Sequence, residues 1–587
     1  MSRDEQARER IRTSLDESLI VEAAAGTGKT TELVRRIVNT LQAGKTSVDR
    51  IVAVTFTRKA AGELRLRLRI ELDNARNATT STREIRHLED ALARLEEAHI
   101  GTIHSFCTEL LRQRPVEARI APGFEELDEN QAARLYARAF HTWIQDALQR
   151  MPEGVRRALS RVGAGYSGGD NSPLDQIRAA GWALVEWRDF PRAWRRDDFN
   201  QRKEVDRIIP EVIELARMTA TCTVAGHPVR HHLRLVTDLV SRMRRSEQMR
   251  PRDYDELEAQ LVQLARALGR NHSRGSKKFS PQFSRDEILA AKDRLLATLH
   301  EFQRHSEADL AALLQSELQG LIEKYEELKA RSGKLDFADL LIRVRNLIRE
   351  NADVRRFMQD QFTHIFVDEF QDTDPVQVEI LVLLAADDPN QNDWRAVRPK
   401  PGKLFLVGDP KQSIYRFRRA DIITYQELCR RLQEKGVVIE YLRRSFRAVK
   451  PIQDAVNAAF APEMTGDIAT GQPAYVPLEE VAPAGEQPAF VVLPAPSPYG
   501  VQRVSNEAID RCLPDATAAF ADWLIRESGW KVREPGTDKL VPVASQHIAI
   551  LFRRFMSWGA DVTGDYVHAL EARNIPSVKK SKQSVRR

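Results

Sequence analysis

Cysteine is scarce in this chain, and its few cysteines lie far apart. The 587 residues contain four of them, at positions 107, 222, 429 and 512, with no CxxC pair and no Cys/His cluster. Structural zinc and iron–sulfur sites need closely spaced ligands, and disulfide frameworks belong mostly to small secreted domains. We therefore expect no disulfides, no structural zinc and no iron–sulfur cluster, and the cytoplasm is the simplest compartment.

Long apolar runs are also lacking. No stretch of about 18 apolar residues occurs, so we expect no membrane span. The N-terminal run MSRDEQARERIRTSLDES is charged and lacks the apolar centre of a signal peptide. Hydrophobic residues make up 42% and charged residues 30%, which is typical of a soluble globular protein, and the length predicts several domains or subdomains.

Basic and acidic residues nearly balance in this chain, except in its last eleven residues. Lys and Arg number 90 against 84 Asp and Glu, which gives a formal charge of +6. The final stretch SVKKSKQSVRR holds five basic residues and no acidic one, so almost all of the excess lies in this tail. Net charge alone therefore gives little support to nucleic-acid binding.

Short apolar runs alternate with helical patterns, which indicates an α/β fold with a parallel sheet. The expected strands are SLIVEAAA at 18–25 and the runs at 50–56, 99–106, 363–369 and 404–409. The polar, helical stretch from about 107 to 330 is interpreted as an insertion. After a Pro-rich stretch at 473–498, a second α/β region is expected around AFVVLPAP, HIAILF and two helices.

The run AAAGTGKTT fits a phosphate-binding loop between a strand and a helix, with Ala23 in place of the first glycine. Successive N–H groups and the helix N-terminus would bind phosphate. Lys29 would reach the β- and γ-phosphates, and the Thr30 hydroxyl would bind Mg²⁺. The remaining expected ATP contacts in this loop are Ala23, Ala24, Ala25, Gly26, Thr27, Gly28 and Thr31. An ordinary Gly-rich turn is the alternative.

A second half of a phosphate site is expected at IFVDEFQDT. Its strand ends in Asp368 and Glu369, at the edge of a parallel sheet where ligands bind. Asp368 suits Mg²⁺, and Glu369 suits positioning and deprotonating an attacking water. An acidic pair that only caps a helix is the alternative.

Seven segments, in order, resemble the UvrD/Rep/PcrA helicases of superfamily 1, and most closely their RecB and AddA relatives. They are AAAGTGKTT, VTFTRKAAGEL, GTIHSFC, LDFADLL, VDEFQDTDPVQ, LVGDPKQSIYRFRRAD and LRRSFRA. The resemblance implies a P-loop fold with tandem RecA-like parallel sheets, the second incomplete. It divides the chain into domain 1A (1–110 and 331–440), a helical insertion 1B (111–330), a partial domain 2A (441–576) and a basic tail (577–587).

The resemblance also implies roles for residues of the ATP site. Gln6 would read the adenine, and Arg36 and Phe446 would sandwich it. Gln412 would sense the γ-phosphate, and Arg447 would be an arginine finger, since a guanidinium suits phosphoryl oxygens. The alternative for Arg447 is a solvated arginine. ATP and Mg²⁺ are the implied cofactors.

A strand-engaging surface is implied in the same way, because a motor indifferent to sequence binds phosphates and stacks on bases. Some of its aromatic residues could instead be core residues, and its arginines could be surface charge. The expected DNA contacts are Phe56, Thr57, Arg58, His104, Phe106, Tyr415, Phe417 and Arg418.

Two functions remain open from the sequence. The first is an ATP-dependent 3′→5′ DNA helicase or translocase in recombination and repair, acting on single strands and junctions, with a RecC- or AddB-like subunit as its candidate partner. The second is an ATP- and strand-binding module with little motor activity. The family's motifs V and VI are not found and the resemblance stops at Pro576, so we expect a truncated or frame-shifted chain; a natural short variant is the alternative.

Overall fold

The structure is a computed structural model in which the chain forms two compact units. The larger unit comprises Glu5–Glu22 and Thr30–Glu440, and the smaller one comprises Met1–Asp4, Ala23–Lys29 and Tyr441–Arg587. The structure describes residues 2–161, 172–190, 192–196, 198–269, 278–416, 419–467, 470–479, 487–496, 498, 504–534, 539–557 and 560–579.

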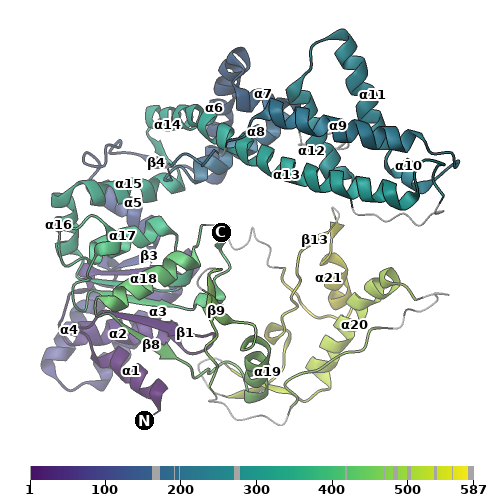
Figure 1. The fold of residues 1–587 in the computed structure, drawn as a ribbon. Helices are drawn as coiled ribbons and strands as arrows, with labels where there is room; N and C mark the ends of the chain where they lie inside the picture. The colour runs from purple at the N-terminus through teal and green to yellow at the C-terminus, as the bar shows by residue number, and fades with distance from the viewer. Residues whose placement is uncertain are drawn as a thin grey trace. The chain divides into compact units, whose positions relative to one another are not determined.

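Six strands form one sheet in the order β3–β2–β6–β7–β1–β8. The pairs β1–β7, β2–β3, β2–β6 and β6–β7 are parallel. In Figure 1, strands from the purple N-terminal part lie beside green strands from the middle of the chain. This sheet confirms the expected α/β class. The strands are β1 (Leu19–Ala23), β2 (Ile51–Thr55), β3 (His99–Thr102), β6 (His364–Val367), β7 (Leu404–Gly408) and β8 (Val438–Leu442).

Helices pack against this sheet and build the main core. The apolar faces of α5, α15, α16 and α18 join the central strands in one buried cluster. Apart from Gln377 and Glu379, helix α17 is apolar, and it is almost fully buried, as expected for a helix inside the core. The helices around the sheet are α1 (Arg3–Thr13), α2 (Lys29–Gln42), α3 (Arg58–Ala78), α4 (Thr82–Ala93), α5 (Ile103–Gln113), α15 (Phe337–Glu350), α16 (Ala352–Gln361), α17 (Pro375–Ala385) and α18 (Ile422–Glu434).

The expected helical insertion is helical in the structure and holds two apolar cores. One core joins α9, α11, α12 and α13, and the other joins α6, α7, α8 and α14. A buried arginine stands between them: Arg157 donates to both oxygens of Glu258 (2.9 and 3.0 Å) and to Asp309 (2.6 Å). The elements are β4 (Glu125–Glu126), α6 (Glu129–Arg150), α7 (Glu153–Ser160), α8 (Pro173–Glu186), α9 (Gln201–Ala220), α10 (Pro228–His232), α11 (Arg234–Met249), α12 (Tyr254–Ala267), α13 (Arg285–Glu317), α14 (Gln319–Arg331) and β5 (Lys334–Leu335).

The described part of the smaller unit contains three helices and three antiparallel two-stranded sheets. Its small apolar core joins α20 and α21 through Ala518, Ala521, Leu570 and Ile575. The elements are α19 (Lys450–Phe460), β9 (Thr465–Asp467), β10 (Gln472–Ala474), α20 (Asn506–Arg526), β11 (Lys531–Arg533), β12 (Leu540–Pro542), β13 (Met556–Ser557), β14 (Ala560–Asp561) and α21 (Gly564–Glu571).

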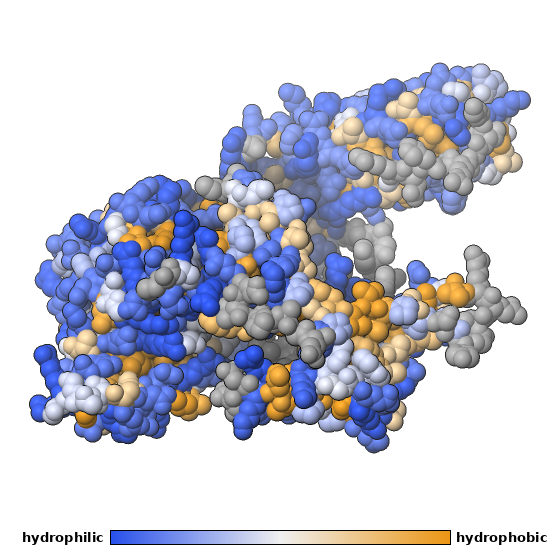
Figure 2. Space-filling model, turned by 90° about the horizontal axis from the view of Figure 1, so that it is seen from below, coloured by the Kyte–Doolittle hydropathy of each residue, from blue (hydrophilic) through white to orange (hydrophobic). Residues whose placement is uncertain are grey.

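The expected second parallel sheet does not form among the described residues of this unit. The apolar run at 490–493 has no strand pairing and exposes its side chains by 46–92%. A parallel strand is stable only when neighbours cover both of its faces, and no described residues of the unit give this run such cover. Figure 2 shows hydrophilic side chains over much of one face of the molecule, with hydrophobic patches between them. None of the described helices has an apolar stretch long enough to cross a bilayer.

The parallel sheet determines where the sequence motifs meet. Because its strands run the same way, β1, β2, β3, β6 and β7 all end at one edge. The phosphate loop follows β1, the acidic pair follows β6, and the GDPKQ run follows β7, whose strand lies between the other two. Ligands of open α/β sheets bind at this edge.

Candidate nucleotide and nucleic-acid site

The phosphate loop in the smaller unit has the backbone that an anion-binding turn requires. Gly26 and Gly28 have φ values of +78° and +84°, which glycine adopts without strain. The Thr27 hydroxyl is fully buried and donates to the carbonyl of Ala24 at 2.8 Å, which closes the turn. Helix α2 begins directly after it, at Lys29. A helix N-terminus behind a glycine turn favours bound phosphate.

The LRRSFRA segment lies against this loop within the same unit. The Phe446 amide donates to the Gly26 carbonyl at 2.8 Å, and the Ser445 hydroxyl donates to the Ala25 carbonyl at 3.1 Å. A Cβ atom on Gly26 would lie 2.5 Å from the Cβ of Arg447. Phe446 and Arg447, both expected at the ATP site, are exposed beside the loop.

Thr30 and Asp368 meet in the larger unit, although they are 338 positions apart. The Thr30 hydroxyl at the start of α2 donates to Asp368 Oδ2 at 3.0 Å. The other carboxylate oxygen accepts from the Glu369 amide at 3.0 Å. A hydroxyl and a carboxylate are hard oxygen donors, and Mg²⁺ is commonly held by one or two such groups together with phosphate oxygens. The two residues therefore fit the expected metal.

Glu369 occupies a backbone conformation that is rare for its residue type. Its φ of +53° lies in the left-handed region, which costs energy for a residue with a side chain. The neighbouring side-chain amide of Gln371 donates to Glu369 Oε2 at 2.8 Å. This hydrogen bond fixes the direction in which the carboxylate points at the sheet edge.

Gln371 was missed by the sequence reasoning, although it lies inside the quoted motif. Its side chain is 2% exposed, and its Oε1 accepts from the Asp409 amide at 2.8 Å. A Cβ on Gly408 would lie 2.9 Å from that oxygen and 3.2 Å from the Gln371 backbone nitrogen, so a larger residue there would displace the Gln371 side chain. Gln371 therefore connects the end of β7 to Glu369 at the end of β6. The only sequence signal was a glutamine two residues after an acidic pair.

Gln412 lies in a short helical turn after β7, as expected for a residue at the sheet edge. Its amide donates to Asp409 Oδ2 at 2.7 Å, and Lys411 forms an ion pair with the same residue at 3.0 Å. Nearby, burial raises the pKa of Glu22, which accepts from the Tyr425 hydroxyl at 3.3 Å. Buried carboxylates thus organise the polar groups at this edge.

Arg36 does not serve the adenine, which corrects the expectation. Its side chain is 2% exposed, and its guanidinium donates to the carbonyls of Ile11, Ser14 and Glu17 at 2.7–3.0 Å. These carbonyls lie in and after the last turn of α1, where helices leave acceptors without partners. Burial lowers the pKa of Arg36 to about 10. Arg36 thus anchors α1 to α2, whereas Gln6 lies on α1 itself.

The expected strand-engaging residues divide into exposed and buried groups. Phe56, after β2, and Tyr415, after β7, have ring centroids 4.5 Å apart. Thr57 caps α3 by accepting from the Ala60 amide, and Arg58 is exposed at the first turn. The rings of Phe56 and Tyr415 thus form one aromatic pair at the carboxyl edge.

His104 has an aromatic neighbour that the sequence reasoning missed. Its ring lies edge-on to Phe337, at 5.6 Å, and Phe337 is 48% exposed at the start of α15. Phe106, in contrast, is 3% exposed and packs edge-on against Phe362, so it is a core residue and not a base-stacking one. Phe417 and Arg418 lie outside the described residues.

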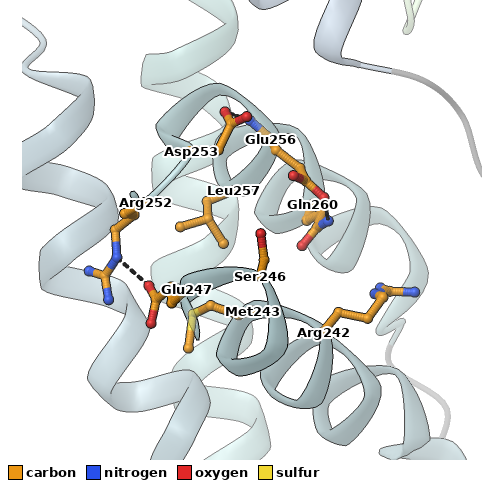
Figure 3. A pocket seen from close by; sticks show the side chains of 9 residues that line it. All are labelled: Arg242, Met243, Ser246, Glu247, Arg252, Asp253, Glu256, Leu257 and Gln260. Atoms are coloured by element: carbon orange, nitrogen blue, oxygen red, sulfur yellow. Dashed lines mark hydrogen bonds and ion pairs between the residues drawn. The ribbon is translucent and has the colours of Figure 1, made fainter. Parts of the chain in front are cut away.

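The structure also has a small pocket away from these motifs. It lies between α11 and α12, with Met243 and Leu257 among its lining residues (Figure 3). Arg252 at its side is paired with Glu247 at 2.6 Å, as the dashed line marks. We assign no chemistry to this pocket.

Comparison with known proteins agrees with the geometry of the sheet edge. The family model of the UvrD/REP helicase N-terminal domain matches residues 4–433. Three similar curated proteins, each named as the A subunit of an ATP-dependent helicase/nuclease, come from Streptococcus suis, Syntrophomonas wolfei and Listeria welshimeri. They are 26%, 28% and 27% identical over 76–77% of this chain, which spans 37–38% of their lengths. Residues 4–433 place this chain in the UvrD/REP helicase family.

Proposed function

We propose that this chain is an ATP-dependent DNA helicase or translocase that moves 3′→5′ along single strands in recombination and repair. The observation that carries the proposal is the contact of Thr30 with Asp368, which joins the start of α2 to the acidic strand end. Family membership supports ATP as the nucleotide. The names of the relatives support helicase activity, and their description as one subunit supports a partner chain of the AddB or RecC kind.

The proposed chemistry is hydrolysis of the γ-phosphate. Lys29 and the loop amides bind the phosphates, and Thr30 and Asp368 would hold Mg²⁺, which neutralises phosphate charge when bound. Glu369, held by Gln371, orients the attacking water and accepts its proton. Gln412 responds to the γ-phosphate, Arg447 supplies a second positive charge, and Phe446 and Gln6 contact the base.

The proposed strand path runs along the ends of β2, β3 and β7. Phe56 and Tyr415 present a joined aromatic surface, and His104 adds a ring that packs on Phe337. Each base has a π-face, so such rings hold a strand of any sequence. Thr57, Arg58 and Arg418 would hold phosphates, and Phe417 would extend the stack. Single strands and single-strand/duplex junctions are the proposed substrates.

The first test measures ATP hydrolysis with and without saturating single-stranded DNA. Glu369→Gln should lower kcat by about 10²–10⁴-fold while ATP still binds, because only the base is lost. Lys29→Ala should weaken ATP binding itself. Glu63→Gln, an exposed glutamate on α3, is the matched control and should hydrolyse like the parent. If the parent, with saturating single-stranded DNA, hydrolyses ATP no faster than Lys29→Ala, the motor function is contradicted. The ATP- and strand-binding module then remains as the function.

Polarity and strand binding are tested separately. A duplex with a 3′ overhang should be unwound and one with a 5′ overhang should not; the reverse result would contradict the 3′→5′ assignment. The logarithm of the association constant should fall with the logarithm of the salt concentration, with a slope of about −0.7 per phosphate contacted. A flat response would exclude the proposed phosphate contacts.

A further inference from the structure

Arg419, at the end of the GDPKQSIYRFRRAD segment, lies in a strained conformation. Its φ of +68° is in the left-handed region, although it carries a long side chain. Such conformations persist only where the surroundings over-determine them. Arg419 is no part of the proposed ATP or DNA contacts, so its strain has to be explained by other contacts.

Those contacts come from the turn that follows α8 in the helical region. Arg419 Nη1 donates to the Glu186 carbonyl at 2.9 Å, and Nη2 donates to Asp189 Oδ2 at 2.5 Å. Its guanidinium lies 4.8 Å from the ring centroid of Trp187, within the range of a cation–π contact. We name residues 186–189 the α8 turn. Three of its four residues therefore contact one arginine from 230 positions further along the chain.

The same guanidinium also reaches the segment that leaves the acidic strand. Arg419 Nε lies 3.3 Å from Asp374 Oδ2. Asp374 is the N-cap of α17 and accepts from the amides of Val376 and Gln377. Arg419 thus connects three parts of the chain: the residue that follows VDEFQDT (Asp374), its own GDPKQSIYRFRRAD segment and the helical region.

The fourth residue of the α8 turn fixes the turn to a second helix. Arg188 is buried and donates to Asp336 and Asp339, at 2.6 Å each. These two aspartates form the reciprocal cap of α15, and Lys329 of α14 pairs with both. The α8 turn is therefore held rigidly on one side, so that a movement of Arg419 is not absorbed by a loose loop.

We propose that Arg419 is a positioning residue that couples the phosphate site to the helical region through the α8 turn. The inference rests on the proposed function. A nucleotide-dependent shift of the GDPKQ segment is passed by Arg419 to the α8 turn, and a strand on the proposed path that also reaches the helical region acts back on hydrolysis along the same contacts. Such coupling is reciprocal by thermodynamic necessity.

The test replaces Arg419 by glycine, which adopts the same φ without strain. Basal hydrolysis should stay within about twofold of the parent, whereas stimulation by single-stranded DNA should fall at least about fivefold, the lower end of typical coupling factors. Arg419→Lys keeps the charge but not the forked donors, so it should restore the stimulation in part. Arg430→Ala, an exposed arginine on α18, is the control and should behave like the parent.

A double variant separates coupling from a merely structural role. If Asp189 acts through Arg419, then Asp189→Asn combined with Arg419→Gly should lose no more stimulation than Arg419→Gly alone. A structural role would instead lower basal hydrolysis and the urea midpoint together with the stimulation. Equal loss of all three quantities, or full stimulation in Arg419→Gly, would overturn the proposal.

Tryptophan fluorescence gives a reading that does not depend on hydrolysis. Saturating ATP should change the emission of Trp187, and the change should vanish in Trp187→Phe and in Arg419→Gly. If ATP binds, as measured by calorimetry, without this change, the coupling is wrong and the proposed function stands. If ATP does not bind at all, the proposed function is wrong and the coupling is wrong with it.

Discussion

Gln371 offers the sharpest test of how the phosphate site is built. Its buried side chain accepts from the Asp409 amide and donates to Glu369, each at 2.8 Å. Gln371→Leu removes both hydrogen bonds at similar volume. The Asp409 amide, at a residue that is itself buried, is then left without its acceptor, which costs about 1–3 kcal/mol. Glu369 is half-exposed, so water replaces its lost donor and adds little to that cost.

Gln371→Glu separates the two hydrogen bonds, because it keeps the oxygen that the Asp409 amide needs. Its folding cost from the lost amide bond should therefore be small. The second oxygen takes the place of the nitrogen that lies 2.8 Å from Glu369 Oε2. Even when the two carboxylates move to about 4 Å apart, they repel by about 4 kcal/mol at an effective dielectric constant of about 20. One of the pair holds its proton at neutral pH, which raises the pKa of a carboxyl at this position. Hydrolysis should fall at neutral pH and recover as the pH rises.

Urea unfolding and the pH profile of hydrolysis together check both variants. Gln371→Leu should shift the unfolding midpoint downward, and Gln371→Glu should shift the pH profile upward. Gln377→Leu, the same change at a half-exposed position on α17, is the control for both readings. If Gln371→Leu unfolds and hydrolyses like this control, the connection between β6 and β7 has no energetic role, and the reasoning is refuted.

Three further changes test other parts of the fold. Burial lowers the pKa of His364 from its ordinary 6.5 to about 4, so the unfolded chain takes up the proton first and stability falls as the pH drops from 6.5 to 4. Without this histidine, His364→Asn should lose about 2 kcal/mol less stability than the parent between neutral pH and pH 5. Its urea midpoint should therefore decrease less than that of the parent over this range. Arg157→Met removes the buried partner of Glu258 and Asp309, which keep ion pairs with the less buried Arg161 and Arg196, and should cost up to about 3–5 kcal/mol in urea unfolding; an unchanged midpoint would contradict the pairing. Gly26→Ala adds a Cβ 2.5 Å from Arg447 at positive φ, and calorimetry should show weaker ATP binding with the larger unit still folded.

The parallel sheet and its phosphate edge could be predicted because they follow from local patterns. Short apolar runs between helices identify parallel strands, and parallel strands end at one edge. That rule places Thr30 and Asp368, 338 positions apart, at the same edge, where the structure has their oxygens 3.0 Å apart. The same rule was wrong in the smaller unit, where the apolar run at 490–493 had the composition of a strand but has no neighbouring strand among the described residues.

The errors at Arg36 and Phe106 have a common physical cause. Arg36 lies on the helix after the phosphate-loop motif and Phe106 lies within GTIHSFC; in both cases the residue type suggested a ligand contact, but burial depends on the neighbouring helix or strand. Helix α2 is buried on most of its circumference, and α1 and the turn after it supply three carbonyls that satisfy a buried guanidinium. Phe106 faces Phe362, which lies far away along the chain. Neither partner could be inferred from the sequence.

Gln371 and Arg419 show a further property of these motifs. Both lie inside segments that match the family's motifs, yet each contacts a segment outside its own motif. Gln371 contacts the end of β7, and Arg419 contacts the α8 turn. Their contacts are to backbone groups and carboxylates of the protein and, for Arg419, to the ring of Trp187, so ATP affinity alone would not register their loss. Nucleotide binding is therefore an incomplete measure of a variant in this chain. A variant that binds ATP normally can still have lost the contacts by which one motif positions the next, and only hydrolysis measured with and without a strand distinguishes the two cases.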